Sequence, residues 1–238
     1  MHLRVEHGDE SVERHRESWD VKTPRGRPPM TPWDVVVGFE DALVRYTGAP
    51  DAVAVGSCTD AIFLVCRYLG VGIVEIPART YVSVPQAIVR AGGRVVWREE
   101  DWQGWYQLRP YPIWDSAKRL RRDMWGLRST RDRPSYICLS FHARKTLPIG
   151  RGGAILTDDP SFGAWAEIAR FDGRRPGAPA HDDVTGQPGW HMSMTPEEAA
   201  RGLWLLSYLP DEPPDQPMDP YPDLRQWDWN AHDPRGEP

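Results

Sequence analysis

Short apolar runs alternate with segments of helical periodicity along most of this chain, from about residue 33 to residue 209. The predicted strands are residues 52–55, 72–76, 94–97, 112–114, 135–141 and 154–157. The predicted helices are residues 33–46, 57–69, 82–91, 160–171 and 195–209. Strands that alternate with helices favour a mostly parallel sheet, because each helix carries the chain back across the sheet. We therefore expect an α/β fold of three layers, with helices on both faces of the sheet.

The two ends of the chain differ in composition from this central part. Residues 1–30 are polar, rich in Arg, Glu and Pro, and without a sustained period, so they are interpreted as an N-terminal arm. Residues 210–238 are a Pro/Asp-rich tail, a composition that cannot build a packed unit of its own. Hydrophobic residues make up 40% of the 238 residues and charged residues 26%, which is typical of a globular domain. The sequence thus predicts one domain over residues 31–209.

Charge and hydropathy argue against two classes of partner. A net charge of −5 and a pI near 5.8 provide no basic excess for a nucleic-acid backbone. No stretch approaches the roughly 18 apolar residues that span a bilayer, and the charged N-terminus lacks an apolar signal core. We expect a cytoplasmic protein that binds neither nucleic acid nor membrane. Cys58, Cys66 and Cys138 are widely spaced within apolar segments, which indicates neither a disulfide framework nor a metal site.

Four connections between the predicted elements concentrate residues that can carry chemistry. Residues 56–61 (GSCTDA) open a helix, whose N-terminus attracts anions, although an ordinary helix cap would use the same residues. Tyr81 begins the next helix, where a core aromatic is equally expected. Asp115 follows a strand, a common place for a turn residue. Lys145 lies in a polar loop before residues 150–153 (GRGG), which precede a strand and are therefore not typical of a nucleotide-binding glycine loop.

Taken in order, these segments resemble the DegT/DnrJ/EryC1/StrS sugar aminotransferases, which use pyridoxal 5'-phosphate (PLP) and share the fold of aspartate aminotransferase, fold type I. The most specific match is residues 140–145 (SFHARK) followed by the GRGG segment. The resemblance implies that Lys145 forms the Schiff base, or aldimine, with PLP and then shuttles a proton during amino transfer. A lysine in this role must be neutral to attack, and a partly desolvated site lowers the pKa of the amine.

The resemblance assigns the cofactor's phosphate to a group of small polar residues. In the family, the turn that matches Ser57, Cys58 and Thr59 holds the phosphate through backbone N–H groups and hydroxyls. Ser140, at the start of the lysine motif, would also help to bind the phosphate.

The resemblance also places three residues around the cofactor's ring. Tyr81, in the segment PARTYVS at 77–83, would stack on the pyridine ring. Asp115, in the segment WDSAK at 114–118, would contact the pyridine nitrogen and keep it protonated, so that the ring can act as an electron sink. Lys118 would lie next to the phenolic oxygen, where family members commonly place Gln or His. Lys145 and Asp115 are therefore the expected catalytic residues.

A weaker match concerns residues 189–194 (GWHMSM). The family has an Asn-x-Arg-Met-like segment there, and its Asn reaches the phosphate of the neighbouring subunit. His191 stands in the place of that Asn and is the candidate for this contact, although an ordinary loop histidine is an equally good interpretation.

The chain departs from the family pattern in three further ways. We expect the small C-terminal domain of the family to be missing, since the Pro/Asp-rich tail follows residue 209. The segment between Trp97 and Asp115 is shorter than in the family, so we expect the sheet to lose an element there. Arg151 replaces a Glu that is usual beside the substrate entrance.

The resemblance implies a homodimeric aminotransferase of sugar biosynthesis. It would move an amino group from an amino acid such as glutamate to a keto-sugar or nucleotide-linked acceptor. Two alternatives stay open, because cofactor residues are shared by several reaction types on similar folds. One is a PLP-dependent lyase or decarboxylase acting on a modified small molecule or nucleotide. The other is a non-catalytic PLP-fold module that binds a partner, although such a protein need not keep Lys145, Asp115 and Ser140 together.

Overall fold

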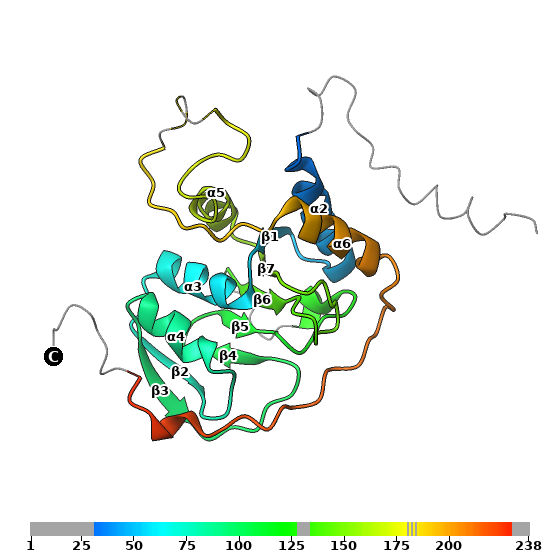
Figure 1. The fold of residues 1–238 in the computed structure, drawn as a ribbon. Coiled ribbons are helices and arrows are strands. Elements are labelled where there is room, and N and C mark those ends of the chain that lie inside the picture. The colour runs from blue at the N-terminus through cyan, green and yellow to red at the C-terminus, as the bar shows by residue number, and fades with distance from the viewer. Residues whose placement is uncertain (1–30, 128–133, 180, 182, 184, 230–238) are drawn as a thin grey trace, which may run out of the picture. The chain divides into compact units, whose positions relative to one another are not determined.

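A computed structural model describes residues 31–127, 134–179, 181, 183 and 185–229 (Figure 1). The predicted arm at residues 1–30 lies outside the described residues. The helices are α2 (Asp34–Thr47), α3 (Cys58–Leu69), α4 (Ser83–Arg90), α5 (Pro160–Ala169) and α6 (Pro196–Leu206). The strands are β1 (Asp51–Val55), β2 (Ile73–Pro77), β3 (Arg94–Arg98), β4 (Tyr106–Leu108), β5 (Ile113–Asp115), β6 (Tyr136–Ser140) and β7 (Gly153–Thr157).

The helix boundaries follow from local capping chemistry. Ser57 caps α3 by accepting a hydrogen bond from the Asp60 N–H, and Gly70 ends this helix in the left-handed conformation at φ 57°. Thr195 and Glu198 form a reciprocal capping box at the start of α6, where Pro196 occupies the first turn. The helix predicted to reach residue 209 ends at Leu206. The predicted starts were therefore more accurate than the predicted ends.

The prediction of a mostly parallel sheet was wrong. The main sheet has the strand order β1-β7-β6-β5-β4, and in it only β5 and β6 pair in parallel. β2 and β3 form a separate parallel pair. The reason is that no helix joins β4 to β5 or β6 to β7, and a chain that returns directly to its neighbour pairs antiparallel, whereas a parallel neighbour requires a crossover. β1, β5 and β6 still run in one direction, so their carboxyl ends lie at the same edge.

The three layers agree with the prediction. Side chains of adjacent strand residues alternate between two apolar clusters, as the two-residue period of a strand requires. Cys138 and Ile155 join the cluster that contains residues of α3, α4 and α5. Ile137 and Leu156 join the cluster that contains residues of α2 and α6. The sheet is thus covered by helices on both faces, and among the described residues no helix combines the length and apolar character that a bilayer span requires.

One strand was not expected from the sequence. β4 lies in the Trp/Tyr-rich segment between Trp97 and Asp115, where the loss of an element was predicted. It is three residues long, which is too short to show the two-residue alternation of a strand in the sequence. It is a strand because it pairs antiparallel with β5. This pairing sets Tyr106 opposite Asp115.

Residues 211–229 do not build a core of their own but lie along the α/β domain. In Figure 1 this orange-to-red segment runs from α6 past β4 to β3. The Leu224 side chain is fully buried, and its N–H donates to the Ala78 carbonyl. Asp215 forms ion pairs with Arg119 and Arg121. The segment is therefore fixed to the domain at both ends.

We predict that Leu224→Ala lowers the free energy of unfolding by about 2 kcal/mol or more, because a fully buried leucine leaves a cavity. Urea denaturation measures this change, and hydrogen exchange should show lost protection in residues 211–229. Met218→Ala is the matched control, since Met218 lies on the same segment with 41% of its surface exposed. Equal effects of the two substitutions would contradict a docked segment.

Candidate active site

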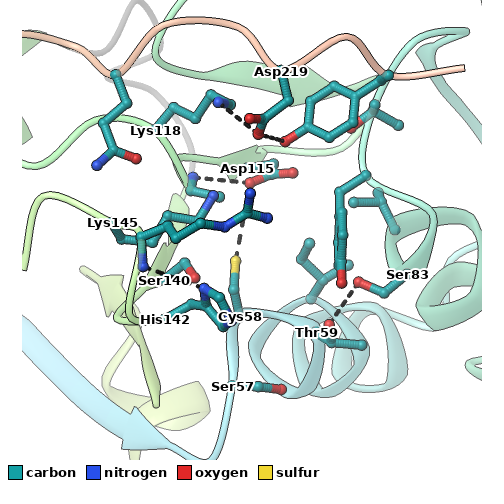
Figure 2. A pocket seen from close by; sticks show the side chains of 18 of the residues that line it. Ser57, Cys58, Thr59, Ser83, Asp115, Lys118, Ser140, His142, Lys145 and Asp219 are labelled. Atoms are coloured by element: carbon teal, nitrogen blue, oxygen red, sulfur yellow. Dashed lines mark hydrogen bonds and ion pairs between the residues drawn. The ribbon is translucent and has the colours of Figure 1, made fainter. Parts of the chain in front are cut away.

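A pocket of about 520 Å³ opens where the carboxyl ends of β1, β5 and β6 meet the N-terminal ends of α3 and α4. This edge is where ligands bind in open α/β sheets, and the volume is in the usual range of small-molecule sites. The predicted site residues Ser57, Cys58, Thr59, Tyr81, Asp115, Lys118, Ser140 and Lys145 all line the pocket. Figure 2 shows Lys118 and Asp219 along one side and Ser57 and Thr59 along the other.

The start of α3 forms a polar end of the pocket. The Ser57 hydroxyl donates to Asp60 Oδ2 at 2.8 Å, and the hydroxyls of Thr59 and Ser83 lie 2.7 Å apart. The first N–H groups of a helix have no partner within the helix, and the helix dipole is positive there. This end of the pocket can bind an anionic group such as a phosphate.

Two glycines of the GRGG segment bring β7 against this helix start. A Cβ on Gly153 would lie 2.5 Å from the Ser57 carbonyl carbon and 2.6 Å from the Cys58 nitrogen. Gly152 has φ +114°, a conformation that side chains disfavour. Any larger residue at 153 would push the start of α3 away from the sheet, so the glycines are part of the pocket's construction.

Asp115 ends β5 with only 3% of its surface exposed. Its carboxylate accepts hydrogen bonds from the Tyr106 hydroxyl at 2.9 Å and from the Ala117 N–H at 3.0 Å. Burial raises the pKa of this carboxyl group, and the hydrogen bonds from Ala117 and Tyr106 oppose that rise. A buried carboxylate of this kind gains from a cationic N–H donor in the pocket.

Sequence reasoning missed Tyr106, which orients Asp115. Its hydroxyl lies 2.6 Å from the Thr80 hydroxyl and is fully enclosed by the domain. Nothing in the Trp/Tyr-rich segment distinguishes Tyr106 from its aromatic neighbours, because only the register of β4 against β5 brings it to Asp115.

Cys58 lines the pocket beside the same carboxylate. Its Sγ atom lies 3.9 Å from Asp115 Oδ1 and 3.7 Å from the Cys138 carbonyl oxygen. Burial, with a smaller contribution from Asp115, raises the pKa of this thiol well above its usual value. This environment favours the neutral thiol of Cys58, which is the less reactive form of a cysteine.

Lys145 lies in the loop after β6, half-buried in the pocket wall. Burial is the main cause that lowers the pKa of its amine, and the positive charge of Lys118 lowers it further. The negative charge of Asp115 acts in the opposite direction. The balance favours the neutral amine more than in water, which is the reactive form of a lysine nucleophile.

Lys118 is buried to 3% exposure and is held by the segment that sequence analysis treated as a tail. Its Nζ lies 3.0 Å from Asp219 Oδ2 and donates to the Pro217 carbonyl. Tyr221 covers the same corner, with its ring stacked on Trp102 at a centroid distance of 6.4 Å. Residues of this segment that line the pocket are Gln216, Pro217, Asp219, Pro220 and Tyr221. The composition of residues 210–238 carried no signal of this contact.

Tyr81 and His191 differ in their relation to the pocket. Tyr81 lines it with 55% of its surface exposed, so a ring face is open to a ligand. His191 does not line the pocket; its side chain is 89% exposed and its Nδ1 lies 3.1 Å from Asp172 Oδ2. The neighbouring Met192 carbonyl accepts a hydrogen bond from the Gly56 N–H, next to the start of α3. A role for His191 at the site of a second subunit stays a prediction.

Comparison with known sequences identifies a family and a curated relative that resemble this chain. The profile of the DegT/DnrJ/EryC1/StrS aminotransferase family matches residues 30–108 and 123–213. The match leaves out residues 109–122, which contain Asp115 and Lys118. The spore coat polysaccharide biosynthesis protein SpsC of Bacillus subtilis strain 168 is 24% identical over 222 residues, covering 73% of this chain and 56% of that protein. The chain thus spans little more than half the length of this relative.

Solved structures with the same fold are also longer than this chain. AtS13 from Actinomadura melliaura has a TM-score of 0.60 and 21% identity, with 87% of this chain and 66% of that chain covered. DesV from S. venezuelae, solved in complex with a ketimine intermediate, has a TM-score of 0.59 and 22% identity, with 84% of this chain and 61% of that chain covered. At these identities the likeness is one of fold.

We predict that Lys118→Met raises the pKa of the Lys145 amine, because it removes a nearby positive charge that disfavours the ammonium form. In the cofactor-free protein, the pH dependence of Lys145 acetylation, read by mass spectrometry of its peptide, should move to higher pH. Arg45→Met removes one charge from an exposed position on α2 outside the pocket and should leave the curve in place. A curve that does not move in Lys118→Met, or moves to lower pH, would contradict this coupling.

Proposed function

Because this chain belongs to the DegT/DnrJ/EryC1/StrS aminotransferase family, we propose that it is a PLP-dependent aminotransferase that moves an amino group from a glutamate-like amino acid to a keto-sugar or nucleotide-linked acceptor. The observation that carries the proposal is the meeting of three features in one pocket. These are an amine of lowered pKa at Lys145, a buried carboxylate at Asp115 and the anion-binding start of α3. Each matches a different part of PLP.

The donor set of the pocket fits this cofactor. The N–H groups at the start of α3 and the hydroxyls of Thr59 and Ser140 would hold the phosphate, and Ser57 would join them by turning its hydroxyl away from Asp60. Asp115 would accept a hydrogen bond from the protonated nitrogen of the pyridine ring. Such a cationic donor would stabilise the buried carboxylate. Tyr81 would cover one face of the ring.

When bound, PLP supplies an electron sink for the negative charge that develops at the donor's α-carbon. Lys145 Nζ would hold the cofactor and then, as a neutral amine, accept the proton from the donor's α-carbon and donate it to the cofactor's C4′ carbon. Asp115 would keep its carboxylate directed at the ring nitrogen, since Tyr106 and the Ala117 N–H fix its orientation. Tyr221 and Trp102, stacked at the pocket wall, would limit the access of water.

A homodimer is part of the proposal. The resemblance places the family's active sites between subunits, and the exposed His191, which contacts Asp172 within the chain, would reach a second copy. Light scattering should give twice the 27.1 kDa mass of the chain, and a monomer at working concentration would count against a contribution from His191.

A second candidate is a PLP-dependent lyase or decarboxylase. The observation that favours it is Lys118, a buried cation in the pocket where the family commonly has a neutral Gln or a His. Product analysis with candidate amino acids separates the two functions, because transamination leaves a 2-keto acid and decarboxylation leaves an amine.

We predict that purified protein retains PLP after desalting, with the visible absorbance of lysine-bound cofactor, and that Lys145→Ala loses it. The chain has only three lysines, Lys22, Lys118 and Lys145, so borohydride reduction and peptide mapping can assign the attachment. Lys118→Met is the matched control, since Lys118 lines the same pocket but is already engaged by Asp219. An adduct on Lys118, or no PLP binding, would refute the proposed role of Lys145.

Asp115→Asn should keep PLP but slow the release of 2-oxoglutarate from glutamate on the order of 10²–10³-fold, because the ring nitrogen loses its charged partner. Asp41→Asn, an exposed position on α2, is the control and should leave the rate unchanged. An unaltered rate in Asp115→Asn would remove Asp115 from the catalytic residues.

A further inference from the structure

Lys118 is a buried cation, and in the described part of the chain its side-chain ammonium makes its polar contacts with the C-terminal segment. Its Nζ pairs with Asp219 Oδ2 at 3.0 Å, donates to the Pro217 carbonyl, and lies 5.7 Å from the centre of the Tyr221 ring. An ammonium with 3% exposure requires such partners, since an unpaired buried charge is strongly unfavourable. The position faces the pocket, next to the proposed cofactor residues Asp115 and Lys145.

The two partners of this ion pair differ in their access to solvent. The Lys118 side chain is 3% exposed, whereas that of Asp219 is 41% exposed. The Asp219 carboxylate can therefore turn into water if it gives up its bonds with Lys118 and with the Tyr221 hydroxyl, but Lys118 cannot follow it, so the ammonium then requires another anion. If Asp219 leaves, the Pro217 carbonyl still holds Nζ, and an ammonium has further N–H donors for another acceptor.

The backbone of the segment does not depend on Asp219. Asp215 pairs with Arg119 and Arg121, and the Gln216 N–H donates to the Lys118 carbonyl at 2.9 Å. On the other side, the buried Leu224 anchors the chain. These contacts flank residues 217–221, so the Asp219 side chain can move while the pocket wall stays in place.

We propose that Lys118 is a carboxylate-binding residue of the pocket, and that Asp219 is its internal occupant, which a carboxylate of the substrate displaces. The site already accommodates one carboxylate, that of Asp219. The hydrogen bond from Lys118 is the main cause that lowers the pKa of the Asp219 carboxyl group, and the positive charge of Arg144, which lines the same pocket, lowers it further. A second cation thus faces the incoming anion. That this anion belongs to an amino donor or to an acidic sugar rests on the proposed function.

The test measures carboxylate binding rather than activity. Glutarate, its neutral analogue glutaramide, and glucuronate are titrated by calorimetry into the full chain, both free of cofactor and with PLP fixed by borohydride. Wild type should bind glutarate or glucuronate weakly and glutaramide not at all. Asp219→Asn should bind the carboxylate on the order of fivefold more tightly, because it removes a partly exposed competing pair. Lys118→Met should lose the binding.

Matched controls separate this effect from damage to the fold. Asp211→Asn, on the same segment but paired with Arg122 outside the pocket, should leave the affinity unchanged. Lys118→Gln, the neutral residue common in the family, replaces Lys118→Met if the latter does not fold. Inorganic phosphate should bind the cofactor-free forms of all variants equally through the start of α3.

The proposal is overturned if Asp219→Asn binds the carboxylate no more tightly than wild type, or if Lys118→Gln keeps wild-type affinity. Tighter binding of glutarate assigns the site to the amino donor, and tighter binding of glucuronate assigns it to the acceptor. Failure of PLP to bind would refute the proposed function alone, since the titrations of the cofactor-free protein still decide the role of Lys118.

Discussion

The buried carboxylate of Asp115 is the constraint on which the pocket depends. It sits at the end of β5 with hydrogen bonds from a phenol and a backbone N–H, neither of which carries a positive charge. The two strands that flank β5 position the residues around this carboxylate, since β4 supplies Tyr106 and β6 leads to the loop of Lys145. Among the residues that the structure describes, no cation is bonded directly to this carboxylate. A cationic ring in the pocket would supply one.

The two lysines of the pocket have different environments and therefore different chemistry. Lys145 is half-buried, and its amine is pushed toward the neutral form by burial and by the charge of Lys118. Lys118 is almost fully buried, but its charge is matched by Asp219. One lysine is thus suited to covalent chemistry and proton transfer, and the other to holding an anion. Electrostatic coupling between them would link the proposed carboxylate binding at Lys118 to the reactivity of Lys145.

The segment at residues 211–229 shows how a proline-rich stretch can become part of a site without forming a core. It contributes a few anchors, Asp215, Tyr221 and Leu224, each of which uses a partner that the α/β domain presents. Proline suits this role because it restricts the backbone and limits the entropy lost when the segment docks. The chain covers 56% of SpsC, and within the described residues this segment supplies one wall of the pocket.

The sequence by itself determined the features that depend on neighbours a few residues away. Caps and periodicity are local, so the helix starts at Ser57 and Thr195 and most of the strands could be predicted. The order of the motifs that carry Ser57, Asp115 and Lys145 could be predicted as well. Only the tertiary structure decided the direction of β4 and β7, the contact of Tyr106 with Asp115, and the pairing of Lys118 with Asp219. These depend on strand register and on contacts between residues about 100 positions apart, such as Lys118 with Pro217. No local pattern encodes such contacts, because their free energy arises only when the whole chain is packed.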